Sequence, residues 1–176
     1  MNYILTQWVI FFFIYCFFGW IWETSYISLR KKKWVNRGFL NGPLIPIYGF
    51  GAIIILLLTW SFKNNLALIF ILGMIGATII EYITGSTLIK LFNKRYWDYS
   101  DQRLNVNGHI CLYTSLAWGF VSILLVKLIH PNIKHIILNI PNYAIDIGCI
   151  FLIIIFLYDS IKSTKLALIT KIDYLN

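Results

Sequence analysis

Five long apolar segments dominate this sequence, and each approaches or exceeds the length needed to cross a bilayer. A transmembrane helix requires about 20 predominantly apolar residues. Only 12% of the 176 residues are charged, too few to cover a water-facing surface, since a soluble domain carries roughly 25%. This excludes a soluble globular enzyme, a disordered chain and a free nucleic-acid-binding domain. The sequence predicts an all-α integral membrane protein, a five-helix bundle forming one domain over residues 1–176, with spans at 4–29, 44–62, 66–92, 109–129 and 143–161.

The positions of the basic residues predict how this bundle is oriented. Lys and Arg concentrate in the first loop (30–43), in the loop 93–108 with its flank, and in the C-terminal tail. These regions share one side and hold twelve basic residues, against three on the other side. Because cytoplasmic loops carry the excess of Lys and Arg, we expect the C-terminus in the cytoplasm and the N-terminus outside. Topology thereby accounts for the net charge of +8 without nucleic acid.

Prolines refine the expected boundaries. The run Asn41-Gly42-Pro43 predicts the start of the second helix, because proline is tolerated in a helix's first turn. Pro131 and Pro141 bracket residues 130–142, where isoleucines recur at intervals of three and four. That spacing predicts a short helix lying in the outer membrane interface.

Two glutamates within the predicted spans, Glu23 and Glu81, are the main candidates for chemistry. A carboxylate in hydrocarbon is costly, so it generally faces the bundle interior, pairs with a cation or lines a watery cavity. We expect the first, third and fourth helices to pack together through small residues and to hold both glutamates in a cytoplasm-facing polar pocket. The stripes that predict this packing are Cys16, Gly19 and Tyr26; Gly73, Ala77, Thr84 and Gly85; and Cys111, Ser115, Gly119 and Ser122.

Each glutamate leaves two interpretations open. Intramembrane ionisable residues generally mark functional sites, which favours Glu81 and Glu23 as catalytic or ligand-binding residues. Alternatively, each is a protonated or hydrogen-bonded acid that only holds helices together. Glu23 lies nearer the interface and can also pair with Arg30 or Lys31.

The loop 93–108 is the densest polar stretch of the chain. Arg95, Asp98 and Asn105 are suited to binding a phosphate or another headgroup, the arginine through its two-pronged guanidinium. The alternative is an interfacial belt in which the aromatic residues of the loop rest at headgroup level. Those residues are Tyr96, Trp97 and Tyr99.

Metal and nucleophilic chemistry find little support. His109 and Cys111 would point to different faces of a helix, and no further ligand lies near them in the sequence. Ser100, His109 and Asp98 lack the elbow motif of a serine hydrolase. We therefore expect neither a metal nor a cofactor.

Several motifs in order give the chain a family resemblance. They resemble the ABC-transporter type IV permease family, also called CmpB-like, over about residues 15–125. Tyr96 stands where a second Trp is usual in the family, and His109 where an apolar or small residue is common. The matching motifs are residues 18–23, 37–51, 81–85, 95–100 and 105–111, with Ser115 and Trp118-Gly119.

The resemblance implies a multi-pass protein of the bacterial inner membrane with a role in import or export. It also favours the binding interpretation of the loop 93–108 over the interfacial belt. Since the chain has no nucleotide-binding motif, transport would require a separate ATPase subunit on the cytoplasmic loops. The candidate ligand- or headgroup-binding residues in these motifs are Arg95, Trp97, Asp98, Asn105, Asn107, His109, Asn41 and Tyr48.

Three functions from different classes remain open. The leading one is a small transport-type subunit whose glutamate-lined pocket binds a polar or ionic ligand. Because five spans are few for a complete path, it would act as an oligomer. The second is an intramembrane enzyme for a lipid or isoprenoid, with Glu81 as acid or base and Arg95 and Asn105 holding the headgroup. The third is a structural or chaperone-like subunit. Membrane lipids are expected partners in every case, and nucleic acid in none.

Overall fold

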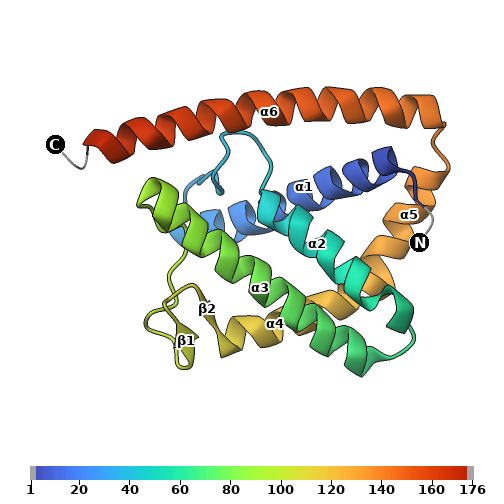
Figure 1. The fold of residues 1–176 in the computed structure, drawn as a ribbon, viewed down its shortest axis with the longest axis horizontal. Coiled ribbons are helices and arrows are strands. Elements are labelled where there is room, and N and C mark those ends of the chain that lie inside the picture. The colour runs from blue at the N-terminus through green and yellow to red at the C-terminus, as the bar shows by residue number, and fades with distance from the viewer. Residues whose placement is uncertain (1–2, 174–176) are drawn as a thin grey trace.

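The computed structural model describes residues 3–173, most of which are helical (Figure 1). Four continuous helical stretches are long and apolar enough to cross a membrane, and α2 with its 3-10 turn forms a shorter apolar stretch. The expected all-α membrane bundle agrees with this arrangement. In chain order the elements are α1 (Leu5–Lys31), α2 (Pro46–Thr59), η1 (Trp60–Phe62), α3 (Leu66–Phe92), β1 (Asn105–Val106), β2 (Ile110–Cys111), α4 (Leu112–Leu124), η2 (Leu125–Ile129), α5 (His130–Leu138) and α6 (Asn142–Asp173).

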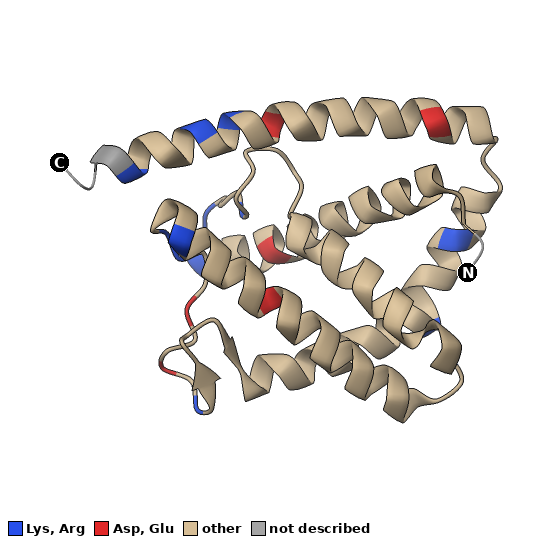
Figure 2. Cartoon of the chain, in the orientation of Figure 1, with Lys and Arg blue, Asp and Glu red and all other residues tan. Residues whose placement is uncertain are grey.

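The helices are arranged with α2 between α1 and α3, with α4 against α3, and with α6 along α1 (Figure 1). Phe11, Leu56 and Ile69 from the first three helices are fully buried in the shared core. Successive long helices run in opposite directions, so the loop after α1, the short β1–β2 hairpin and the C-terminal end of α6 lie at one end of the bundle. Most Lys and Arg residues gather at this same end (Figure 2).

The second helix begins later than the sequence indicates. It starts at Pro46, which occupies the first turn, and residues 41–45 are irregular. The backbone N–H groups of Asn41 and Gly42 are bound instead by the Asp159 carboxylate of α6. That contact holds this segment in a bent, non-helical conformation, so the run Asn41-Gly42-Pro43 precedes the helix rather than starting it.

The fourth helix differs from expectation at both ends. It begins at Leu112, because residues 105–111 form the antiparallel hairpin. It then continues through the π-helical turn η2 into α5, so the separate interfacial helix expected over 130–142 is part of one 27-residue helical stretch. Proline inside a regular α-helix clashes with the carbonyl four residues earlier. The wider turn η2 ends at Ile129, two residues before Pro131, and lets the helix continue.

Small residues mediate the helix contacts, as predicted. A Cβ atom on Gly19 would collide with the Tyr48 ring of α2, and one on Gly73 would collide with Ser122 of α4. The expected grouping of the first, third and fourth helices is wrong in one respect, because α2 is the partner of α1. Tyr26 is 56% exposed and lies outside the packed stripe.

Candidate functional site

Glu81 lies on α3, well inside the bundle, and its side chain is only 4% exposed. The hydroxyl of Tyr99 donates to its Oε1 at 3.1 Å, and the indole Nε1 of Trp118 donates to its Oε2 at 2.9 Å. Within residues 3–173 no Lys or Arg forms an ion pair with this carboxylate. A buried charge without a counter-charge is strongly unfavourable. Glu81 therefore needs either a proton or a cation from outside the chain.

Glu23, on α1, is the second acid of the site, and it is partly exposed. Its Oε2 lies 3.4 Å from Nε of Arg37, and its Oε1 accepts the Tyr48 hydroxyl at 3.1 Å. The expected pairing with Arg30 or Lys31 does not occur. Arg30 lies seven residues further along α1, about 10 Å at the helical rise, whereas the loop after α1 folds back and returns Arg37 to the carboxylate.

An aromatic bridge connects the two glutamates. The rings of Tyr48 and Trp118 meet edge to face with centroids 5.8 Å apart, and each donates to one of the carboxylates. Gly19 makes this possible, because the Tyr48 ring occupies the space of its missing side chain. We call this set the carboxylate cluster; its members are Glu23, Tyr48, Glu81, Tyr99 and Trp118.

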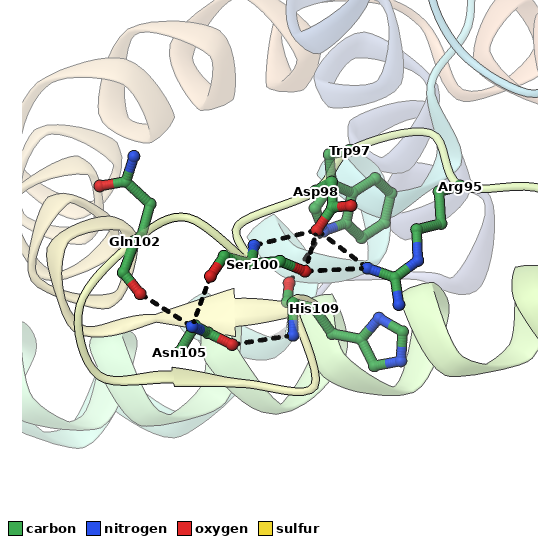
Figure 3. Close-up of polar contacts among 8 residues, drawn as sticks. Arg95, Trp97, Asp98, Ser100, Gln102, Asn105 and His109 are labelled. Carbon is green, nitrogen blue, oxygen red and sulfur yellow. Dashed lines mark hydrogen bonds and ion pairs between the residues drawn. The ribbon is translucent and has the colours of Figure 1, made fainter.

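The polar side chains of the loop 93–108 bind mainly to one another (Figure 3). Arg95 Nη1 lies 2.9 Å from Oδ1 of Asp98, which also accepts the backbone N–H and the hydroxyl of Ser100. The pKa of Asp98 is lowered, chiefly because the hydroxyl and the N–H of Ser100 donate to its carboxylate. Desolvation opposes this shift, and the positive charge of Arg95 adds to it. Asn105 donates to the carbonyls of Ser100 and Gln102. These residues, predicted to bind a headgroup, are therefore already engaged in folding the loop.

Other residues of the loop bind its two ends together or anchor it to α3. Trp97 donates its indole N–H to the carbonyl of His109 at 2.8 Å, and Asn107 donates to the hydroxyl of Tyr82 at 3.3 Å. The buried ring of His109 packs edge-on against Tyr82. Burial, followed by the nearby Arg95, lowers the pKa of His109, which favours the neutral ring.

The aromatic residues of the loop do not all lie in a belt at headgroup level. Tyr99 reaches inward to Glu81 and belongs to the carboxylate cluster. Burial, followed by the negative charge of Glu81, raises the pKa of Tyr99, so its hydroxyl keeps the proton that it donates. The hairpin loop thus covers the buried carboxylate from the basic end of the bundle.

Asn41, a further candidate, contacts α6 rather than the carboxylate cluster. Its backbone N–H donates to Oδ1 of Asp159 at 3.2 Å and its amide to the Ser163 hydroxyl at 2.7 Å. Sequence reasoning missed Asp159, although it is an acid within the fifth predicted span and the rule that selected Glu23 and Glu81 applies to it. It also missed the partners of the glutamates, because Arg37, Tyr99 and Trp118 come from distant segments.

Comparison with known proteins identifies one family. No curated protein and no solved structure matches the chain. The family model described as "Putative ABC-transporter type IV" matches residues 10–164. This range includes the whole carboxylate cluster and Asp159, and it extends past the motifs at 15–125 that carry the resemblance. The chain therefore belongs to the CmpB-like family of ABC-transporter type IV membrane proteins.

Proposed function

We propose that this protein is a transport-type membrane subunit in which Glu81 binds the positive charge of the transported species. One observation carries this proposal: Glu81 is buried, has two donors and lacks a cationic partner in the described chain. Trp118 is only a donor, so it favours the ionised carboxylate. A cationic ligand or a proton completes the balance of charge.

The surroundings of Glu81 suit a cation. The ring faces of Tyr48 and Trp118 attract positive charge through their quadrupoles, and the two lie in edge contact beside the carboxylate. Glu23 is already neutralised by Arg37. Glu81 is therefore the member of the carboxylate cluster whose charge a ligand would balance.

The wider arrangement proposed here has five crossings, with the basic end of the bundle in the cytoplasm of a bacterial inner membrane. The loop after α1, the hairpin and the end of α6 lie together at that end (Figures 1 and 2). A separate ATPase subunit would dock on them, because the chain has no nucleotide-binding motif. Several copies of so small a bundle would build the path.

The alternative of an intramembrane enzyme for a lipid is less well supported. It requires Arg95 and Asn105 to hold a headgroup, whereas both are hydrogen-bonded within their own loop. A purely structural subunit is the remaining alternative, and cation-dependent thermal stability distinguishes it from a transport subunit.

The test measures ligand-dependent stability of the purified full chain in detergent. We expect that one of Na⁺, K⁺, Mg²⁺, tetramethylammonium or spermidine, compared at constant ionic strength, raises the melting temperature of the wild type. A ligand at about 100 times its Kd stabilises by about 2.7 kcal/mol. Glu81→Gln keeps the shape and one acceptor but removes the charge, so it should lose this shift.

Asp101→Asn is the matched control, because Asp101 is an exposed loop acid and its loss changes the net charge equally. It should keep the cation-dependent shift. If no cation stabilises the wild type, or if Glu81→Gln is stabilised as well as the wild type, Glu81 acts only as a hydrogen-bond acceptor between helices.

A further inference from the structure

The last turns of α1 carry an open hollow on the side away from the carboxylate cluster. Ser25, Ser28, Leu29 and Lys32, all from this one helix, line it, and it is shallow and widely open to its surroundings. At 3.6 residues per turn, these positions share one face of α1, and that face lies opposite Glu23. The hollow is therefore separate from the site proposed above.

The hollow combines donors with positive charge. Ser25 is exposed and presents a free hydroxyl, while Ser28 accepts the Val35 N–H at 3.0 Å and still has its own proton to donate. Lys32 ends α1 in a left-handed conformation, with φ 51°. No acidic residue occurs between Glu23 and Glu81 in the sequence, and Arg37 pairs with Glu23. Nothing of opposite charge in this segment competes for Lys32.

The charge around the hollow exceeds that of the helix end itself. The C-terminus of a helix carries about half a negative charge, which by itself disfavours an anion. The four consecutive basic residues Arg30, Lys31, Lys32 and Lys33 are all exposed and outweigh it. The net field at this end of α1 therefore attracts anions.

Below the polar rim the same side of α1 is apolar and open. Leu29 is 79% exposed and Trp22, two turns earlier, is 70% exposed. In a membrane such side chains face lipid tails, and Trp is typical of the headgroup level. A ligand with an anionic head and an apolar tail matches a basic, polar surface that lies next to an apolar one. A free phosphate ion would leave Trp22 and Leu29 without a partner.

We propose that this hollow binds an anionic phospholipid, with the Lys32 ammonium and the Ser25 hydroxyl as donors to its phosphate. Anionic headgroups attract basic residues beside membrane helices. The run Arg30–Lys33 then has two functions: as a whole it sets orientation, and Lys32 within it holds one lipid. The binding site lies on the face of α1 opposite Glu23, away from the carboxylate cluster, so it does not depend on the proposed transport function.

The test is a titration of the purified full chain in a neutral detergent, with melting temperature as the readout. Short-chain phosphatidylglycerol should raise the melting temperature more than phosphatidylcholine of equal chain length, and inorganic phosphate should not replace it. Lys32→Asn removes the charge, and asparagine tolerates the left-handed backbone. It should require about tenfold more phosphatidylglycerol for the same shift, since it loses a charge-assisted hydrogen bond.

Lys33→Asn is the matched control, because it removes one charge from the same run at a position that does not line the hollow. It should titrate like the wild type. If Lys32→Asn does not fold, Ser25→Ala should weaken the response and Ser25→Thr should restore it. Equal effects of Lys32→Asn and Lys33→Asn, equal shifts with both lipids, or an equal shift with phosphate would each overturn the proposal.

Discussion

At the scale of single residues, three acids of the helices, Glu23, Glu81 and Asp159, are buried or half-buried, and they differ in what balances their charge. Glu23 has Arg37 as a cation, and Asp159 accepts the backbone N–H groups of Asn41 and Gly42. Glu81 has only neutral donors. Glu23 and Asp159 thus stabilise the fold through partners within the chain. The charge of Glu81 is left without a counter-charge in the described chain.

Asp159→Asn tests the structural assignment of this acid. Asparagine has one acceptor oxygen and one NH₂ group, so a donor would face Asn41 N–H or Gly42 N–H. We expect a loss of about 1–3 kcal/mol in the free energy of unfolding, measured as a lower melting temperature in detergent. Asp146→Asn, an exposed acid on the same helix, should change it little. Equal melting temperatures for both variants would show that the contact between α6 and the loop contributes nothing to stability.

At the scale of elements, the irregular segments carry the parts of the site that sequence periodicity does not predict. Apolar length correctly indicated α1, α3 and most of α4 and α6, because hydrocarbon selects for helices. The segment before α2 and the hairpin loop are held by contacts between residues far apart in sequence, such as Asn41 with Asp159 and Tyr99 with Glu81. Such pairs leave no periodic signal, so the glutamates could be predicted and their partners could not.

The glycines of the packed faces allow a direct test of helix packing. Gly73→Ala would place a methyl group onto Ser122, a fully buried residue of α4 whose hydroxyl already donates to the Trp118 carbonyl. We expect a loss of about 1–3 kcal/mol from overpacking, measured by thermal unfolding in detergent. Gly51→Ala on α2 meets nothing within 4 Å. It should be neutral or stabilise by up to about 1 kcal/mol, because alanine favours helix. If the two variants melt alike, α3 and α4 are not in tight contact.

At the scale of the whole molecule, the distribution of charge and the path of the chain agree. The loop after α1, the hairpin and the C-terminal end of α6 lie at one end, and that end holds most of the Lys and Arg residues (Figure 2). α2 with η1 is only 17 residues long, about 26 Å at the helical rise, against a hydrocarbon thickness of about 30 Å. In the proposed arrangement of five crossings, the irregular approach before Pro46 would supply the remaining length, with Asp159 bound to its backbone; irregular backbone is tolerated at this depth only when protein covers it.

The orientation that we expect from this charge distribution can be tested with single cysteines. In a background where Cys16, Cys111 and Cys149 are replaced by serine, we expect Asn64→Cys to react with a membrane-impermeant maleimide from outside intact spheroplasts. Trp34→Cys and Asp101→Cys, exposed at the basic end, should react only after permeabilisation. The excess of basic residues at that end is the physical reason.

The same three positions also test the number of crossings. Position 34 lies before α2, position 64 between α2 and α3, and position 101 after α3, so opposite labelling of neighbours requires the helix between them to span. If positions 34 and 64 react from the same side, the short helix α2 enters the membrane without crossing it, and four crossings remain. The N-terminus and the C-terminus would then share a side. If all three react in the reverse sense, the basic end faces outward, and the ATPase docking proposed for it would be impossible.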